Sequence, residues 1–370
     1  MNILITGSNG FVGKNLVAEL KNQGYEHLML CDRNTSEEEL MSYTQNADFV
    51  FHLAGVNRPK NNSEFVSGNQ GFTEKLVALL SKGNTKPPIM FASSTQAELS
   101  NPYGESKREA ERAVRTYGQE NNVEVMIYRF PNLFGKWCKP NYNSVVATFC
   151  HNISHGIAIQ VNDESITLTV AYIDDVIASL ISILSVNNRN SVNDFYNVSP
   201  TYDVTLGRLV DLLTSFKQSR SDLSIAQLDN GLVKKLYSTY LSYLPERDFS
   251  YDLKMHKDER GSFTEFIRTP DRGQVSVNIS KPGITKGNHW HHTKNEKFLV
   301  VSGQGVIRFR KIESAEVIEY FVSGEKLEVV DIPVGYTHNI ENLGNQDMVT
   351  LMWVNEPFDS NRPDTYYLEV

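Results

Sequence analysis

Near the carboxyl end of the chain, the stretch GNHWHHTKNE (287–296) holds three histidines and a glutamate. In a strand, His289 and His291 point to one side and His292 to the other, so the first two can bind one ion while His292 is exposed. Glu296 begins the next strand-like run, and a fourth histidine, His338, follows a later turn. Three imidazoles and a carboxylate suit a divalent transition metal with an open position. We expect zinc, since nothing downstream indicates oxygen chemistry, although iron, nickel and manganese bind similar sets.

A second pair of chemical interest is Tyr103 and Lys107 in the segment YGESK. If this segment opens a helix that runs to about Tyr117, the two side chains lie on one face, about 5 to 6 Å apart at Cβ. The ammonium group would stabilise the phenolate and lower the tyrosine pKa from about 10. Tyr103 could then exchange a proton with a carbonyl or an alcohol near neutral pH. Most such helix pairs are simply solvated, so the pair gains meaning from what surrounds it.

The amino-terminal stretch GSNGFVG places Gly7, Gly10 and Gly13 between a β-branched run and a helical pattern. Glycines at these positions let the backbone turn tightly and approach a pyrophosphate, which binds the first amide groups of the helix. Asp32 ends the second expected strand at about the 20-residue distance of the residue that binds the ribose in a dinucleotide fold. The stretch therefore predicts a dinucleotide-binding domain.

Two alternatives concern the bound nucleotide. A phosphate loop of the Walker type would need a glycine where Ser8 stands and a serine or threonine where Asn15 stands, so we reject it. Asp32 can accept hydrogen bonds from both ribose hydroxyls of NAD, whereas Arg33 could bind the 2′-phosphate of NADP. The pair is ambiguous, and a reductive role would favour NADPH.

The elements that must position these residues follow two different patterns of secondary structure along the chain. Up to about residue 240, buried β-branched runs alternate with helical stretches, which predicts an α/β Rossmann-type doubly wound parallel sheet. Those strands are expected at 2–6, 28–32, 48–55, 88–94 and 123–130. After about residue 250, strands with period-two alternation follow one another, as in an antiparallel barrel or jelly roll. We assign 1–243 to the first domain and 250–370 to the second.

Composition excludes several classes of protein. The 370 residues are 40% hydrophobic and 22% charged, which is ordinary for a globular chain and excludes a disordered one. The net charge of −8 and the lack of a basic block argue against nucleic-acid or anionic-membrane partners. The three cysteines are scattered without a C-x-x-C spacing, and neither a signal peptide nor an apolar run of about 18 residues is present. We expect a cytoplasmic protein.

Residues 1 to about 240 resemble the extended short-chain dehydrogenase/reductases that act on nucleotide sugars. The matching stretches, in order, are GSNGFVG, HLAG, FASST, YGESK, RFPNLFG, YIDDV and YNVSP. The resemblance implies that Tyr103 is the proton donor, that Lys107 binds the nicotinamide ribose, and that Ser94 and Asn132 contact the sugar nucleotide. It implies a cofactor site formed by Gly7, Asn9, Gly10, Phe11, Val12, Gly13, Asp32, Arg33, Leu53, Ala54, Gly55 and Lys107.

Two departures from that family bear on the reaction. The loop from Ser94 to Tyr103 is unusually short, which leaves open whether Ser94 or Thr95 contacts the substrate. The Asp-Glu pair that the 4,6-dehydratases carry is replaced by Gln96 and Ala97, so we do not expect dehydration.

The second domain resembles the metal-binding cupins. The first cupin motif is matched by Gly283, His289, His291, Glu296 and Gly303, and the second by Pro333, Gly335, His338 and Asn342. One departure is Leu327, which stands where a glycine is expected before Pro333. The stretch DERGSFTE (258–265) is similar to the entry of cupin-type sugar 3,5-epimerases, which implies that Arg260 and Glu265 bind substrate. The candidates for the acid and the base of epimerisation are Tyr320, Tyr336 and His338, and the sequence does not choose among them. His289 and His291 are disfavoured in this role because they would bind the metal.

The whole arrangement resembles the capsular polysaccharide enzymes that carry both domains. That resemblance implies a bifunctional enzyme: the cupin epimerises a UDP-4-keto-6-deoxy-N-acetylhexosamine at C3, and NADPH then reduces the 4-keto group, on the route to UDP-N-acetyl-L-fucosamine. One alternative is a nucleotide-sugar 4-reductase or 4-epimerase whose cupin is a structural or dimerisation module. Another is a non-catalytic NADP sensor, which the presence of both Tyr103 and Lys107 disfavours. We also expect a homodimer, because β segments such as MVTLMWV would leave unpaired edges if exposed.

Overall fold

The chain forms two compact units in a computed structural model that describes residues 1–142, 144–185 and 195–370. Unit 1 comprises Met1–Thr214 and Leu228–Pro245, and unit 2 comprises Ser215–Gln227 and Glu246–Val370. Unit 2 thus also contains the end of helix α8 (Leu206–Asp222), which the sequence-based boundaries assign to the amino-terminal domain.

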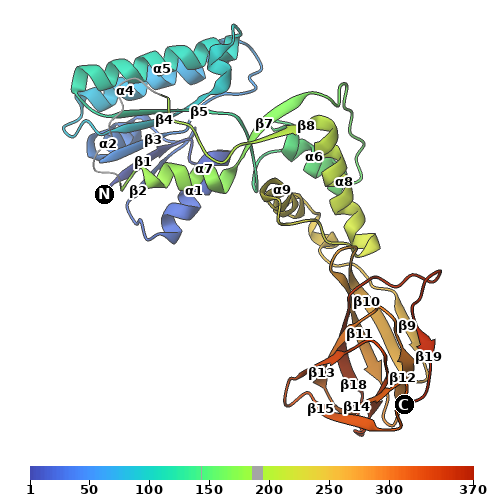
Figure 1. Ribbon diagram of the computed structural model, residues 1–370. Helices are drawn as coiled ribbons and strands as arrows, with labels where there is room; N and C mark the ends of the chain where they lie inside the picture. The colour runs from blue at the N-terminus through green and yellow to red at the C-terminus, as the bar shows by residue number, and fades with distance from the viewer. Residues whose placement is uncertain (143, 186–194) are drawn as a thin grey trace. The chain divides into compact units, whose positions relative to one another are not determined.

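Unit 1 is built on a five-stranded parallel sheet with the order β2-β1-β3-β4-β5. Helices α1 and α7 cover one face, and α2, α4 and α5 cover the other (Figure 1). The predicted doubly wound α/β fold is confirmed. The bounds are β1 (Ile3–Thr6), α1 (Phe11–Asn22), β2 (Leu28–Cys31), α2 (Glu37–Asn46), β3 (Phe49–His52), α4 (Phe72–Lys82), β4 (Ile89–Ser94), α5 (Pro102–Asn121), β5 (Val125–Phe130) and α7 (Ile173–Ser182).

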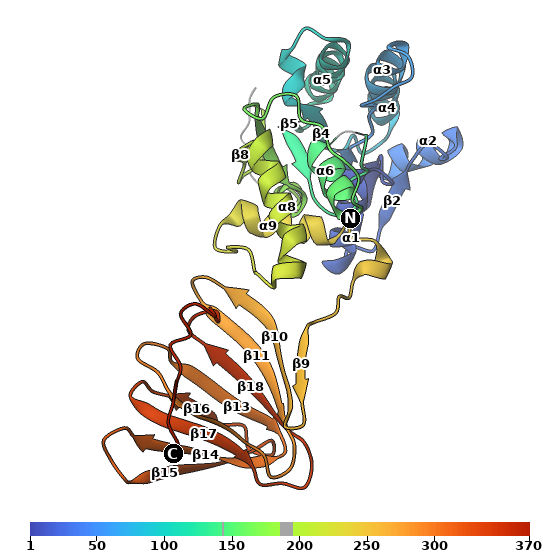
Figure 2. The same cartoon turned by 90° about the vertical axis from the view of Figure 1, so that its right-hand side faces the viewer.

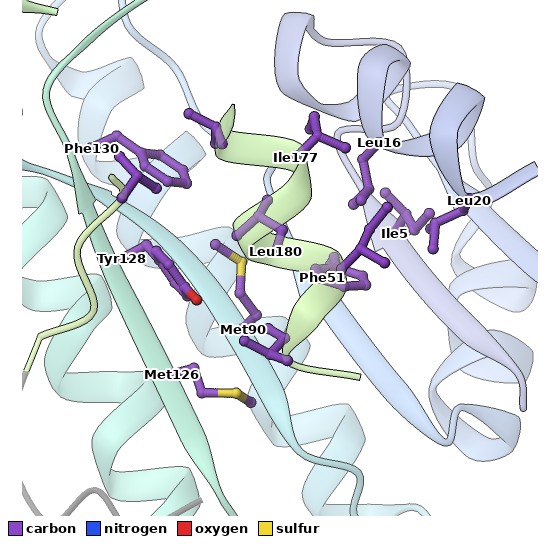
Figure 3. Packing of buried hydrophobic residues seen from close by; sticks show 14 of the residues in the cluster. Ile5, Leu16, Leu20, Phe51, Met90, Met126, Tyr128, Phe130, Ile177 and Leu180 are labelled. Atoms are coloured by element: carbon purple, nitrogen blue, oxygen red, sulfur yellow. The ribbon is translucent and has the colours of Figure 1, made fainter. Parts of the chain in front are cut away.

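The strands of this sheet are buried on both faces, which is why their sequences read as continuous apolar runs. Successive side chains of a strand alternate between the faces: Ile5 packs on the α1 and α7 side, whereas its neighbour Leu4 packs on the side of α2, α4 and α5. Figure 3 shows the first of these two cores, in which Leu16 of α1 and Leu180 of α7 lie over side chains of the sheet.

The rest of unit 1 is a smaller sheet and its helices. Strands β6 (Asn132–Phe134), β7 (Thr167–Tyr172) and β8 (Tyr202–Thr205) form a three-stranded sheet in that order. The other elements are α3 (Ser63–Phe65), the π-helical segment η1 (Val66–Gly71), the 3₁₀ segment η2 (Thr95–Glu98), α6 (Val145–Ser154) and α9 (Gly231–Leu241). Among the helices of the described residues, none combines the length and the hydropathy that a membrane span requires.

Unit 2 consists of antiparallel strands in two sheets, with the orders β16-β13-β18-β11-β10-β9 and β15-β14-β17-β12-β19 (Figure 2). The predicted jelly-roll cupin is confirmed. The bounds are η3 (Glu246–Asp248), β9 (Met255–Asp258), β10 (Gly261–Thr269), β11 (Gly273–Ser280), β12 (Thr285–Trp290), β13 (Glu296–Ser302), β14 (Gln304–Lys311), β15 (Val317–Ser323), β16 (Val329–Ile332), β17 (Tyr336–Asn342), β18 (Met348–Val354) and β19 (Tyr366–Tyr367).

The prediction that MVTLMWV would leave an unpaired strand edge is wrong. The segment MVTLMWV forms β18, which is paired on both sides, with β11 and with β13, and so leaves no open edge. An edge of the second sheet is β15, where Phe321 is 69% exposed and Val317, Ile318 and Tyr320 are also exposed.

Candidate active sites

The glycine loop of unit 1 lies where the order of the sheet reverses, between β1 and β3, at the carboxyl ends of both strands. Ligands of doubly wound sheets bind at such points. Gly7 has φ +70°, and a Cβ there would lie 2.8 Å from the backbone of Ala54. A Cβ on Gly13 would lie 2.2 Å from the carbonyl oxygen of Gly7. Because Gly10 caps α1 without a side-chain hydrogen bond, the first amide groups of the helix remain available to a pyrophosphate.

The acidic residue after β2 is already engaged with this loop. Asp32 accepts hydrogen bonds from the side-chain amide of Asn9 and, at 2.7 Å, from the backbone N–H of Asn34. Arg33 beside it is exposed. The arrangement fits a ribose at Asp32 and leaves the guanidinium group of Arg33 free to turn toward a 2′-phosphate.

A directional chain of buried hydrogen bonds lies beneath the loop, and the sequence does not reveal it. Thr73 Oγ1 donates to the carbonyl of Asn69 at 2.6 Å and therefore accepts from His52 Nε2 at 2.8 Å. His52 Nδ1 in turn accepts from Thr6 Oγ1 at 2.7 Å, and Thr6 Oγ1 accepts from the amide of Ala54 at 3.2 Å. Burial lowers the pKa of His52 to about 3, so the ring is neutral. The chain holds the ends of β1 and β3 together under the predicted cofactor site.

Helix α5 begins where the proposed catalytic residues require it to begin. Asn101 caps the helix by accepting the N–H of Gly104 at 2.8 Å, and proline occupies the first turn. Tyr103 and Lys107 are four residues apart in this helix, as the sequence predicts, and both are shielded from solvent.

The expected pKa shift of Tyr103 is wrong for the structure as it stands. Burial raises the pKa of Tyr103, opposed by a hydrogen bond with Ser94. The Lys107 ammonium instead donates to the carbonyl of Ala92 at 2.8 Å and lies 4.9 Å from the centre of the Phe91 ring. Burial lowers the pKa of Lys107 itself to about 8. A Cβ on Gly55 would lie 3.2 Å from Lys107 Nζ, so the ammonium sits against the predicted cofactor-lining stretch.

Of the two hydroxyl groups left open by the sequence, the structure brings Ser94 to Tyr103. Thr95 Oγ1 instead lies 3.4 Å from the carbonyl of Phe130. Asn132 begins β6, is exposed, and donates to the carbonyl of Thr169 at 3.3 Å.

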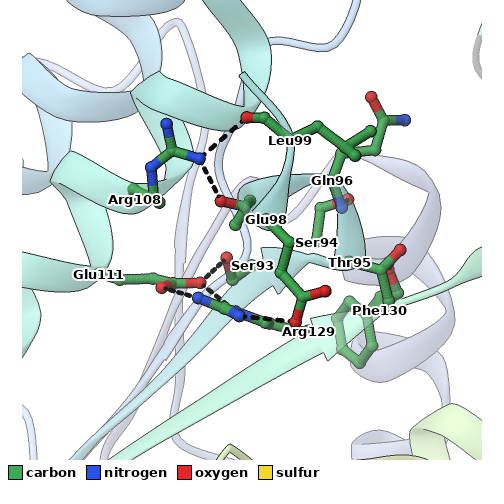
Figure 4. Close-up of polar contacts among 11 residues, drawn as sticks. Ser93, Ser94, Thr95, Gln96, Glu98, Leu99, Arg108, Glu111, Arg129 and Phe130 are labelled. Atoms are coloured by element: carbon green, nitrogen blue, oxygen red, sulfur yellow. Dashed lines mark hydrogen bonds and ion pairs between the residues drawn. The ribbon is translucent and has the colours of Figure 1, made fainter. Parts of the chain in front are cut away.

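A buried ion pair braces the strand that ends at Ser94 (Figure 4). Arg129 of β5 donates to both oxygens of Glu111 of α5, at 2.9 and 2.7 Å, and Ser93 Oγ donates to Glu111 at 2.5 Å. Arg108 of α5 donates to the carbonyls of Ala97 and Leu99, which fixes η2 against the helix. The brace therefore ties β4, which carries Ser94, to α5, which carries Tyr103 and Lys107.

In unit 2 the four predicted metal ligands converge. Ligand atoms of His289, His291, Glu296 and His338 all lie within 4.8 Å of one another. Several of these atoms are buried and have no hydrogen-bond partner among the described residues: His291 Nε2, Glu296 Oε2 and both ring nitrogens of His338. Glu296 Oε2 lies 3.1 Å from His338 Nε2. Buried nitrogen and oxygen atoms without hydrogen-bond partners are suited to coordinate a divalent cation. His292 is exposed, as predicted, and the centre of its ring lies 4.5 Å from the centre of the Trp290 ring.

The carboxyl-terminal segment orients this cluster through a contact that residue spacing could not predict. The backbone carbonyl of Asp364 accepts from His291 Nδ1 at 2.5 Å, so Nε2 is the nitrogen that faces the cluster. The Asp364 carboxylate accepts from the amides of His292, Thr293 and Lys294 at 2.9 to 3.0 Å. Asp364 therefore holds both the ring of His291 and the loop that follows it.

A cavity of about 630 Å³ opens above the metal cluster, with His289, Glu296 and His338 in its wall. Of the predicted substrate residues, Arg260 lines this cavity, where it forms an ion pair with Asp258 at 2.6 Å. Glu265 lies at a β-bulge of β10, with its carboxylate 3.9 Å from Arg268.

The open candidates for acid and base are placed differently. His338 belongs to the metal cluster, Tyr320 is 46% exposed on β15, and Tyr336 packs against the core of the unit. Two polar residues that the sequence reading left out, His256 and Lys286, line the cavity.

Comparison with known proteins agrees with the two predicted types of domain. Residues 3–199 match the NAD dependent epimerase/dehydratase family, and residues 256–366 match the polysaccharide biosynthesis C-terminal domain. The chain is 45% identical over 370 residues to the UDP-2-acetamido-2,6-beta-L-arabino-hexul-4-ose reductase of Pseudomonas aeruginosa. The aligned region covers 100% of this chain and 99% of that protein.

Two solved structures set the range of likeness. The crystal structure of the capsular polysaccharide assembling protein CapF from Staphylococcus aureus shares 60% identity, covers all of both chains and has a TM-score of 0.94. The UDP-glucuronic acid 4-epimerase of Bacillus cereus in complex with NAD has a TM-score of 0.53 at 19% identity, over 59% of this chain and 84% of that one, and so shows the fold alone. The predicted resemblance to a two-domain capsular polysaccharide enzyme is confirmed.

Proposed function

The chain belongs to the NAD dependent epimerase/dehydratase family, and from this premise we propose that unit 1 reduces the 4-keto group of a UDP-linked 4-keto-6-deoxy-N-acetylhexosamine. The observation that carries the proposal is the hydrogen bond of Ser94 with Tyr103 and the position of the Lys107 ammonium against Gly55, in a chain that matches a UDP-sugar reductase along its whole length.

In the reduction, each of these side chains has a distinct task. Tyr103 gives its proton to the 4-keto oxygen, and the Ser94 hydroxyl donates a hydrogen bond to the same oxygen. The Lys107 ammonium binds the nicotinamide ribose and, with its positive charge, favours the phenolate that remains. The chemistry that the bound cofactor supplies is a hydride for the carbonyl carbon.

The cofactor of this step is NADPH in our proposal. Arg33 is exposed beside Asp32, where its guanidinium group can pair with a 2′-phosphate.

Unit 2 in our proposal epimerises the same sugar at C3 before the reduction, with one zinc ion held by His289, His291, Glu296 and His338. The chemistry that the ion would supply is that of a Lewis acid at the wall of the cavity. The cavity of about 630 Å³ and its polar wall support an active site rather than a structural staple. The product leads to UDP-N-acetyl-L-fucosamine, a precursor of capsular polysaccharide. We keep the cytoplasmic location and the homodimer in the proposal, the latter supported by the exposed apolar side chains of edge strand β15.

Separation of the two activities tests this proposal. With a UDP-4-keto-6-deoxy-hexosamine in heavy water, Tyr103→Phe should stop the oxidation of NADPH and leave deuterium uptake at C3 unchanged. His291→Ala should stop deuterium uptake at C3 and leave NADPH oxidation unchanged when the epimerised ketosugar is supplied for the reduction. If His291→Ala keeps full uptake at C3 while it loses the metal, the cupin is a structural or dimerisation module, and only the reductase part of the proposal stands.

A further inference from the structure

A β-bulge turns Lys286 into the same cavity as the metal ligands. On β17, His338 and Ile340 point to one face, and β12 pairs with it so that His289 lies opposite His338 and Lys286 lies opposite Ile340. Residues three apart in a regular strand point to opposite faces, so this pairing requires one extra residue. That residue is Asn288, whose φ of +56° is left-handed. Lys286 and His289 consequently both line the cavity.

The Lys286 ammonium is better placed to act on a ligand than the Arg260 guanidinium, which lines the same cavity. Lys286 Nζ donates to Asn278 Oδ1 and to the carbonyl of Ile279, both at 2.8 Å, and both acceptors are neutral. An ammonium has three N–H donors, so one remains. The charge of Arg260 is instead matched by Asp258, which accepts from its Nε at 3.0 Å and its Nη2 at 2.6 Å.

A histidine outside the metal cluster faces the same cavity. His256 of β9 lies opposite Phe263 of β10, which lies opposite Asn278 of β11, the partner of Lys286. Directly opposed residues of neighbouring strands point to the same face. His256 therefore lies in one row with the residue that holds Lys286, and all four residues line the cavity.

Building on the epimerase function proposed above, we propose that Lys286 binds the 4-keto oxygen of the sugar in the cupin cavity and that His256 removes the proton at C3. The C3–H bond breaks, its proton passes to the imidazole of His256, and its electron pair forms the C3=C4 bond while the carbonyl pair moves to the oxygen. The resulting enolate oxygen is held by the Lys286 ammonium. A water molecule then gives a proton to C3 from the opposite face as the enolate collapses to the ketone. The imidazolium of His256 gives its proton to the hydroxide that remains, which restores the base and completes the inversion.

The rate of deuterium uptake at C3 in the full chain, with a UDP-4-keto-6-deoxy-hexosamine in heavy water, tests the assignment. Lys286→Met should slow uptake about 100- to 1,000-fold, the range for loss of one oxyanion-stabilising group. Lys286→Gln should be equally slow although it keeps a donor toward Asn278, whereas Lys286→Arg should keep most of the rate because it keeps the charge. His256→Asn should abolish uptake. The matched control is Lys281→Met, which removes a lysine paired with Asp347 at 2.8 Å on the surface of the same unit and should match wild type.

Metal content and the reduction of the supplied epimerised ketosugar should stay at wild-type levels in every variant. Wild-type uptake in Lys286→Met or in His256→Asn would overturn that residue's assignment and leave the proposed epimerase intact. Loss of metal together with uptake would also overturn the catalytic assignment, in favour of a structural role. No uptake by the wild-type chain would show that the proposed function of the cupin is itself wrong.

Discussion

At the scale of single residues, the reductase site depends on a lysine whose charge is costly to bury. Lys107 contacts a carbonyl and an aromatic ring, and burial lowers its pKa from 10.5 to about 8. Burial raises the pKa of Tyr103, so the phenol keeps its proton over the same range. The group that titrates first as the pH rises is therefore the lysine.

Reduction should accordingly lose efficiency in mildly basic solution. The folded pKa of Lys107 lies below its ordinary value, so the ammonium is present below about pH 8 and is lost as the pH rises through that value. We expect kcat/KM for NADPH, which reports groups of the free enzyme, to fall about tenfold per pH unit above about 8. The residual activity of Lys107→Arg, whose guanidinium stays charged, should lack this fall. A wild-type profile that is flat to pH 10 would contradict the role of the ammonium.

Asp364 illustrates a residue that acts on the metal site without being a ligand. Asp364→Ala removes the carboxylate that accepts three backbone amides of the loop after His291. Because such supporting contacts orient the ligands, we expect the affinity for zinc to fall about 10- to 100-fold in competition with a chelator. Asp359→Ala is the matched control in the same segment, since within the part of the chain that the structure describes its carboxylate accepts a single hydrogen bond, at 2.9 Å from the amide of Asn361. Equal zinc affinities for the two variants would contradict this account.

Residue spacing predicted that Tyr103 and Lys107 share one helix, and the resemblance to the two cupin motifs predicted that His338 joins the cluster of His289, His291 and Glu296. The spacing could not predict contacts between distant parts of the chain, such as Asp364 with His291, 73 positions apart. It also missed the sign of the Tyr103 pKa shift, because burial by Phe65 and the surrounding helices is a tertiary property. The sequence analysis missed Lys286 for a different reason. Regular strand alternation from His289 would place Lys286 on the face that points away from the cavity.

At the scale of elements, the reductase site relies on the brace between β4, β5 and α5. Parallel strands were predicted at nearly their observed positions because doubly buried strands read as continuous apolar runs. The bulge in β12 and the π-helical segment Val66–Gly71 were not, because each changes the period of the chain by about one residue without a distinctive composition.

The brace makes a prediction about two glutamates of the same helix. Glu111 is 6% exposed and is paired with Arg129, whereas Glu109 is 40% exposed and is paired with Arg112 at 2.7 Å. Glu111→Ala removes the bidentate partner of a buried guanidinium, which keeps the exposed carboxylate of Glu98 at 3.1 Å, and should lower local stability by about 3 kcal/mol. Glu109→Ala should lower it by less than about 0.5 kcal/mol. Native-state hydrogen exchange of the β4 and β5 amides in the full chain measures both, and equal protection in the two variants would exclude a stabilising brace.

At the scale of the whole molecule, the function proposed above assigns successive reactions on one sugar to the two units of one chain. The 4-keto group makes C3 acidic enough to epimerise, and reduction of that group then fixes the new configuration. This order explains why an isomerase-like cavity and a reductase site belong to one polypeptide. It also separates their requirements, since deuterium uptake at C3 needs no nicotinamide and reduction needs no metal.

The most direct measurement is a pair of complete turnovers by the wild-type chain on a UDP-4-keto-6-deoxy-hexosamine, with the product analysed by nuclear magnetic resonance. One turnover uses heavy water and ordinary NADPH, and the other uses ordinary water and NADPH deuterated at the transferred position. The account predicts deuterium at C3 from the first turnover and at C4 from the second. A product without deuterium at C3 in the first, or without deuterium at C4 in the second, would contradict it.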